Sequence, residues 1–194
     1  MTRRLFVFDD PDRFVAGAVG DPGQRTFYLQ ARKGGALVSV SLEKVQVAAL
    51  AERLAELLER IGDDELSVTA ASTDDAPLPE PLEEPLEEPL EEPLEEPLVE
   101  LFRVGPMAVA WEPESARIMV EAQPLSDDGE YAAVSDDADD GPDLVRVRVA
   151  PERARAFIRR AGTLIASGRP ACPFCGQPLE PQGHFCSRMN GHLN

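Results

Sequence analysis

The feature that most restricts the fold of this chain is a four-residue repeat at 81–98, PLEEPLEEPLEEPLEEPL. Proline at every fourth position lacks a backbone donor and clashes with the preceding turn, so this stretch cannot form a regular helix. Paired glutamates repel each other and proline favours polyproline II, so the chain is expected to be extended here. We predict a disordered acidic loop at about 72–97 that interrupts one folded body and adds little packing to it. The alternative is a docking site for a basic partner, with the leucines as anchors.

Two similar passages flank this repeat, and each has three short strand-like runs followed by a helical pattern. The predicted strands of the first passage are Arg13–Val19, Thr26–Ala31 and Ala36–Leu42, and its helix runs from Glu43 to a stop at Gly62. The predicted strands of the second passage are Val99–Trp111, Arg117–Gln123 and Leu144–Val149, and its helix runs from Pro151 to a stop at Gly168. The strand–helix junctions, VSVSLEK and VRVRVAPE, also resemble each other.

This organisation predicts an α+β fold in which an antiparallel sheet packs against two helices. We interpret the two passages as a duplicated three-strand-plus-helix unit. The alternative is two unrelated strand–helix junctions, since alternating runs of valine are common. The α+β domain is expected to span residues 1–169, and a small zinc-binding tail is expected at 170–194.

All three cysteines and one of the two histidines lie close together near the C-terminus, in CPFCGQPLEPQGHFC. The candidate metal ligands are Cys172, Cys175, His184 and Cys186. Three thiolates and one imidazole complete the tetrahedral shell of Zn2+ and leave no position for water, which is typical of a structural zinc site. A redox C-x-x-C pair, an iron–sulfur cluster and a catalytic zinc are the alternatives. His192 could replace a ligand, but it follows Asn190-Gly191 and is expected to be exposed.

The distribution of charge argues against nucleic acid as a partner. The net charge is −17, and residues 74–143 hold 23 of the 36 acidic side chains. The C-terminal third is basic, but this acidic middle would compete for its arginines. No run approaches the roughly 20 apolar residues that cross a bilayer, and Leu5–Phe8 is too short for a secretory signal. We therefore expect a cytoplasmic protein without a membrane partner, where clustered cysteines hold metal more often than they form disulfides.

No catalytic motif accompanies these features, since the sequence has no G-x-S-x-G elbow and no H-E-x-x-H. We expect an accessory or protein-interaction module rather than an enzyme. The first alternative is an enzyme whose site lies on the sheet surface around Arg25 or Arg32, with zinc supporting the fold. A deep pocket lined by arginine and carboxylates would favour that alternative. A nucleic-acid-binding protein is the second alternative.

Four segments of the chain resemble the DUF3090 family, proteins of unknown function found mostly in high-GC Gram-positive bacteria. They are Arg13–Gly17, Gly23–Gln30, Ser41–Gln46 and the tail CPFCGQPLEPQGHFC, in which all four candidate ligands match. The resemblance covers nearly the whole chain except the Pro-Leu-Glu-Glu repeat, which looks like an insertion peculiar to this member. It implies no established activity. Gene neighbourhood in the family implies a histidine-phosphatase-like or a kinase-like protein as a partner.

Overall fold

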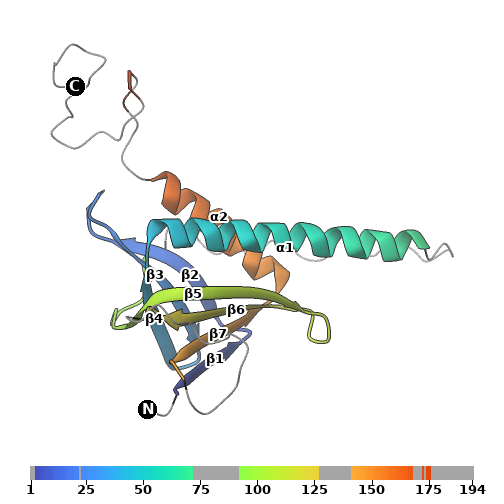
Figure 1. Cartoon of the computed structure of the whole chain (residues 1–194), viewed down its shortest axis with the longest axis horizontal. Helices are drawn as coiled ribbons and strands as arrows, with labels where there is room; N and C mark the ends of the chain where they lie inside the picture. The colour runs from blue at the N-terminus through green and yellow to red at the C-terminus, as the bar shows by residue number, and fades with distance from the viewer. Residues whose placement is uncertain are drawn as a thin grey trace.

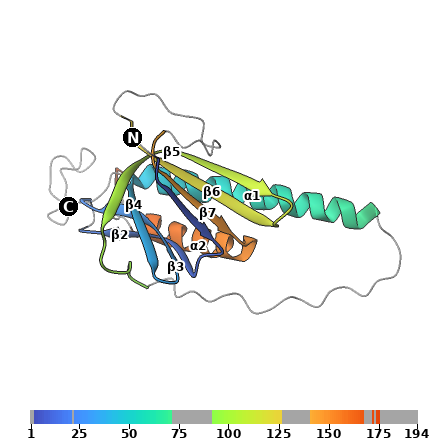
Figure 2. The same cartoon turned by 90° about the horizontal axis from the view of Figure 1, so that it is seen from below.

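One sheet and two helices make up the described part of the chain, in a computed structural model that covers residues 3–21, 23–71, 92–126, 141–167, 172, 174 and 175. The side chains of the first helix are described as far as Gly62. Within these residues the sheet has seven strands, and both helices pack on one of its faces (Figures 1 and 2). The predicted α+β class with two helices is therefore confirmed.

The described elements follow one another in a simple order. They are β1 (Leu5–Asp9), β2 (Arg13–Val19), β3 (Thr26–Lys33), β4 (Ala36–Leu42), α1 (Lys44–Ala71), β5 (Glu100–Glu112), β6 (Arg117–Pro124), β7 (Leu144–Val149) and α2 (Pro151–Ala166). In the sheet the strands lie in the order β1-β7-β6-β5-β4-β3-β2. Neighbours within β2–β4 and within β5–β7 are antiparallel, whereas β4 pairs with β5, and β7 with β1, in parallel. The sheet is therefore mixed, with two parallel pairs beside the antiparallel pairs that the sequence predicts.

The predicted three-strand-plus-helix unit occurs twice, as β2-β3-β4-α1 and β5-β6-β7-α2. The parallel β4–β5 pair means that the second unit repeats the first by a shift along the sheet. The strand registers correspond as well. Gln30 on β3 faces Ser39 on β4, and Glu121 on β6 faces Arg146 on β7 at the equivalent place. This correspondence supports a duplicated unit over two unrelated junctions.

An apolar core lies between the sheet and both helices. Every second strand residue faces the helices, as expected from the alternation of side chains along a strand. Helix α1 contributes Leu50 and Leu54 to the core, and α2 contributes Phe157. The ring of Phe157 stacks on that of Phe14 with centroids 4.9 Å apart. Helix α2 begins at Pro151, whose fixed φ suits a first helical turn.

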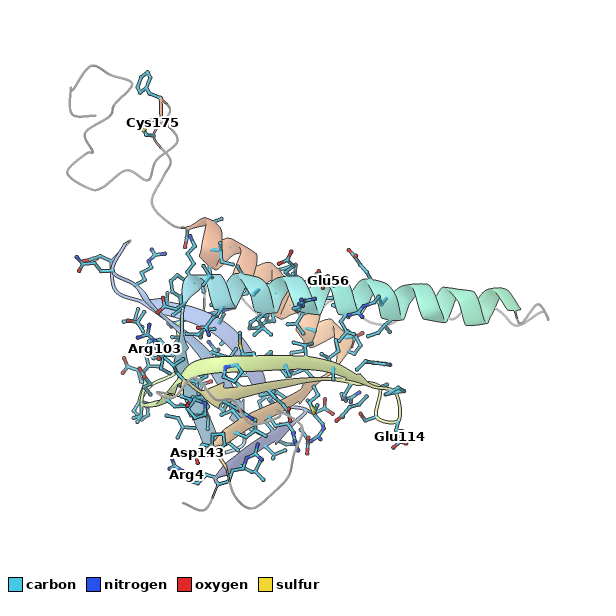
Figure 3. The ribbon with its side chains drawn as sticks, in the orientation of Figure 1. Arg4, Glu56, Arg103, Glu114, Asp143 and Cys175 are labelled. Atoms are coloured by element: carbon cyan, nitrogen blue, oxygen red, sulfur yellow. The ribbon has the colours of Figure 1, made fainter. Side chains whose placement is uncertain are left out.

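Strand β1 is not predicted from the sequence. Its five residues pair with β7, which lies more than a hundred residues further along the chain. Ion pairs fasten both ends of β1 to β7, through Arg4 and Asp143 (2.5 Å, Figure 3) and through Asp9 and Arg148 (3.0 Å). Hydrogen bonds from Arg4 hold the pKa of Asp143 below its usual range. Local patterning in a five-residue run cannot reveal a partner at that distance.

The sheet curls, because β1 and β2 lie at opposite ends of the strand order while only residues 10–12 connect them. Contacts near that connection hold the two ends together. Lys33 at the end of β3 donates a hydrogen bond to the carbonyl of Asp9. The backbone N–H of Gly34 donates to the carboxylate of Asp12 at 2.7 Å.

Helix α1 continues to Ala71, so the predicted stop at Gly62 is wrong. Gly62 does not have a positive φ, and an added Cβ there would meet nothing within 4 Å. Glycine in a helix interior costs about 1 kcal/mol relative to alanine, which is too little to end a helix by itself. The C-terminal half of α1 extends beyond the sheet in Figure 1. No helix of the described residues is both long and apolar enough to cross a membrane.

Candidate functional site

The predicted metal ligands lie only partly within the described residues. Cys172 is buried, and Cys175 is half-buried in a turn beyond the end of α2 (Figure 3). His184, Cys186 and His192 lie outside the described residues. In the part of the chain that the structure describes, no group of three or more histidine, cysteine and acidic side chains could hold a metal. The four-ligand zinc site therefore stays a prediction.

The face of the sheet that points away from the helices, called the polar face below, carries buried polar side chains. They include Gln30, Ser39, Glu121, Gln123 and Arg146, and none of these is more than 8% exposed. Arg146 forms an ion pair with Glu121, and Gln30 Nε2 donates to Ser39 Oγ at 3.0 Å. Buried polar groups are costly unless they have partners. A sheet face that keeps several of them is therefore a candidate for a role beyond packing.

Residues 92–97, the described end of the Pro-Leu-Glu-Glu repeat, dock on this polar face over β2 and β3. The backbone of Glu95 forms two hydrogen bonds with the side-chain amide of Gln30. Gln30 Nε2 donates to the Glu95 carbonyl at 3.0 Å, and the Glu95 N–H donates to Gln30 Oε1 at 2.9 Å. These are the donor and acceptor contacts that a neighbouring strand would offer to the docked chain. The Gln30 side chain that makes them is fully buried.

A glycine makes room for the leucine of the docked segment. A Cβ added at Gly17 on β2 would lie 2.6 Å from Leu94 Cδ2 and 2.6 Å from Leu94 Cγ. Real Cβ atoms essentially never approach other heavy atoms so closely. Glycine inside a strand often marks such a close approach of another chain segment. Leu94 can therefore occupy this place only because residue 17 has no side chain.

Arginines surround the acidic side chains and carbonyls of the docked segment. Arg13, itself buried, contacts the Glu92 carboxylate at 2.5 Å and donates to the Pro93 carbonyl at 2.6 Å. Arg32 pairs with Glu95 at 3.0 Å. Arg160 on α2 donates to the Glu92 carbonyl at 2.5 Å. Together these arginines with Gly17 and Gln30 form what is called the β2–β3 site below.

Residues 92–97 are predicted from the sequence as the end of a disordered loop at about 72–97, but in the structure they pack on the sheet. The reason is that their partners lie about 65–80 residues away and include a side-chain amide that no local pattern marks. One signal was the docking alternative with leucine anchors, and an isolated glycine inside a strand pattern, here Gly17, could have been a second. The rest of that predicted loop, residues 72–91, lies outside the described residues.

Gln30→Leu is expected to lower the free energy of unfolding by about 1–3 kcal/mol, because it leaves the buried Ser39 hydroxyl and the Glu95 backbone without partners. Gln123→Leu is the matched control. Gln123 is equally buried, and its amide has no hydrogen-bond partner among the described residues. Replacing it should therefore be neutral or stabilising. Equal losses of unfolding free energy in the two variants, measured by urea unfolding, would contradict the role given to Gln30.

A pocket of about 290 Å3 lies where β3 begins and β4 ends. It is lined by Arg25, Thr26, Ser41, Leu42, Glu43, Glu100 and Arg103. This is the combination of arginine and carboxylates that the enzyme alternative requires around Arg25, whereas Arg32 lies in the β2–β3 site. Three of the pocket's four charged side chains are engaged within the fold, however. Arg103 pairs with Glu43, and Arg25 donates to Ser167 Oγ at 2.9 Å.

Five arginines in the described part of the C-terminal third are also engaged within the fold. Arg146, Arg148 and Arg155 form ion pairs with acidic side chains. Arg153 and Arg160 donate to backbone carbonyls. Phosphate binding depends on cationic groups that are available at a surface. These contacts therefore give no support to a nucleic-acid interface.

Comparison with known proteins assigns the chain to a family. No curated protein and no solved structure matches it. Residues 6–186 match the model of a family described as "Protein of unknown function (DUF3090)". The matched range includes both three-strand units and extends to Cys186, the last of the predicted metal ligands. The chain therefore belongs to the DUF3090 family.

Proposed function

We propose that this DUF3090 protein is a cytoplasmic protein-interaction module that binds an extended segment on its polar face and carries a structural zinc ion in its C-terminal tail. The observation that carries the proposal is the docking of residues 92–97. Gln30 binds the backbone of Glu95, as a receptor binds an extended peptide, and side-chain contacts select the residues on either side. By contrast, three of the four charged groups of the Arg25 pocket are engaged, since Arg103 pairs with Glu43 and Arg25 donates to Ser167.

The family resemblance adds an expected partner, a histidine-phosphatase-like or kinase-like protein. Chemical cross-linking in native lysate followed by mass spectrometry tests this. We expect cross-links from such a partner to residues of the polar face in the wild-type protein. A Gly17→Val variant should yield fewer of them, because a branched side chain at position 17 occupies the place of Leu94. Cross-links that map only to other surfaces, or that do not respond to Gly17→Val, would contradict the proposal.

The zinc part of the proposal rests on the donor set. Cys172, Cys175, His184 and Cys186 would supply four ligands to a tetrahedral Zn2+ and close its coordination shell. The two described ligands fit this role, since Cys172 is buried and Cys175 follows three residues later in a turn. Zinc held in this way would fix the tail and would offer no open position for a substrate.

Cys172→Ser and Cys186→Ser are each expected to abolish stoichiometric zinc binding, because a hydroxyl does not replace a thiolate ligand. The measurement is the zinc content of purified protein by elemental analysis, after dialysis against a weak chelator. His192→Ala serves as the control and should retain the metal. Equal zinc in the wild-type protein and both cysteine variants would show that the assignment of ligands is wrong.

A further inference from the structure

The contacts of the β2–β3 site define a short recognition sequence. Glu92 contacts Arg13, Leu94 lies over Gly17, and Glu95 contacts Arg32 through its carboxylate and Gln30 through its backbone. Pro93 contributes its carbonyl, which accepts from Arg13. The site therefore contacts all four residues of Glu-Pro-Leu-Glu, through the side chains of Glu92, Leu94 and Glu95 and through the backbone of Pro93.

The same four residues occur four times in the chain, at 80–83, 84–87, 88–91 and 92–95. Only the last of these copies lies among the described residues. The contacts that hold it come from side chains of the β2–β3 site and use nothing unique to positions 92–95. Any segment with the same sequence offers the same groups to the site.

We propose that the β2–β3 site is a receptor for Glu-Pro-Leu-Glu in trans, and that its external ligand is an extended acidic segment of this sequence on a partner protein. The inference rests on the proposed function and names the class of ligand. Charge complementarity supports it, since Arg13, Arg32 and Arg160 all face the docked segment. The mode of binding is that of an extended peptide held by backbone bonds, with pockets for alternate side chains.

The chain's own copy at 92–95 acts as a tethered competitor for this ligand. It is joined to β5 through only four residues, 96–99, so it is always near the site. A short tether gives an effective concentration on the order of millimolar. A partner must exceed that concentration, or bind more tightly, before it displaces the tethered copy. The tethered copy therefore sets the concentration or the affinity that a partner needs in order to bind.

The experiment uses a fluorescein-labelled twelve-residue peptide, EPLEEPLEEPLE, and fluorescence anisotropy. The receptor is the full chain in which residues 80–96 are replaced by a glycine–serine sequence of the same length, so that no copy of the motif remains. We expect saturable binding to this variant, and binding at least about tenfold weaker to the wild-type chain, whose own copy competes. A scrambled peptide of the same composition should not bind.

Two results would overturn the proposal. One is the absence of peptide binding to the replaced variant when circular dichroism shows it to be folded. The other is equal binding of the scrambled peptide, which would reveal only general attraction between acidic peptide and arginines. Cross-links of a partner to the polar face without peptide binding would leave the proposed function in place and remove this ligand.

A second pair of variants keeps the test decisive if the replaced chain does not fold. If the copies are interchangeable, Leu94→Asp alone should be tolerated, because another copy can take the site. Replacing all four motif leucines, Leu82, Leu86, Leu90 and Leu94, by aspartate leaves no copy able to do so. We expect the single variant to shift the urea midpoint by less than half of the shift in the fourfold variant. Equal shifts would show that position in the chain, and not sequence, holds residues 92–95 in place.

Discussion

Arg146→Met is expected to lower the free energy of unfolding by about 3–5 kcal/mol, because it leaves the carboxylate of Glu121 buried without its cationic partner. Glu121 is only 1% exposed, so water cannot take the place of the guanidinium. Breaking a buried ion pair is costly even where the intact pair contributes little net stability. Urea unfolding at neutral pH, followed by circular dichroism, measures the loss.

The double variant Glu121→Leu with Arg146→Met separates the buried charge from the loss of packing. Replacing both partners by apolar side chains of similar volume is often neutral, so most of the lost stability should return. Arg53→Met is the control for an exposed pair, since Arg53 contacts Glu56 on the surface of α1 and should lose about 0–1 kcal/mol. If the double variant were as unstable as Arg146→Met, the loss would come from packing rather than from an unpaired carboxylate.

Replacing residues 80–96 by a glycine–serine sequence of equal length is expected to cost about 3–7 kcal/mol of stability. Three losses contribute. The burial of Leu94 accounts for about 1 kcal/mol. The amide of Gln30 and the guanidinium of Arg13 lose their partners on the docked segment, at about 1–3 kcal/mol each. Thermal and urea unfolding measure the sum.

The matched control replaces only residues 80–91 and keeps the docked copy at 92–95. It should leave the melting temperature nearly unchanged, because all the contacts with Arg13, Gly17 and Gln30 remain. Similar losses in the two replacements would place the stabilising contacts in 80–91 instead. No loss of stability in either replacement would show that the whole repeat is the disordered loop that its sequence predicts.

Most of the strands were predictable because the residues that mark each of them lie close together in the sequence. Alternation of apolar residues marks β2, β4 and β7 at their observed ends, and Pro151 marks the start of α2. The similarity of the two strand–helix junctions also indicated the duplicated unit. These signals depend on residues within one turn or one strand of each other.

What escaped prediction depends on partners far along the chain. Nothing near Leu5–Asp9 reveals that β7 is its neighbour, and nothing near Gln30 reveals that its amide binds Glu95. Proline in 92–97 argues against a regular helix, and the structure has none there. The composition gives no sign, however, that Gly17 and Arg13 hold that chain in one place. Two of the four candidate metal ligands lie outside the described residues, so the metal site stays a prediction.

Strand β1 determines where the series of units ends. When a unit is repeated by a shift along a sheet, the edge of its last strand can still pair with a further unit. Solenoid repeats have the same property and therefore need a terminal cap. Here β1 takes the place beside β7 that the first strand of a third unit would occupy, just as β5 does beside β4. The link through residues 10–12 then ties this last position back to the first strand of the series. The N-terminal strand thus acts as a built-in terminator that limits the sheet to two units.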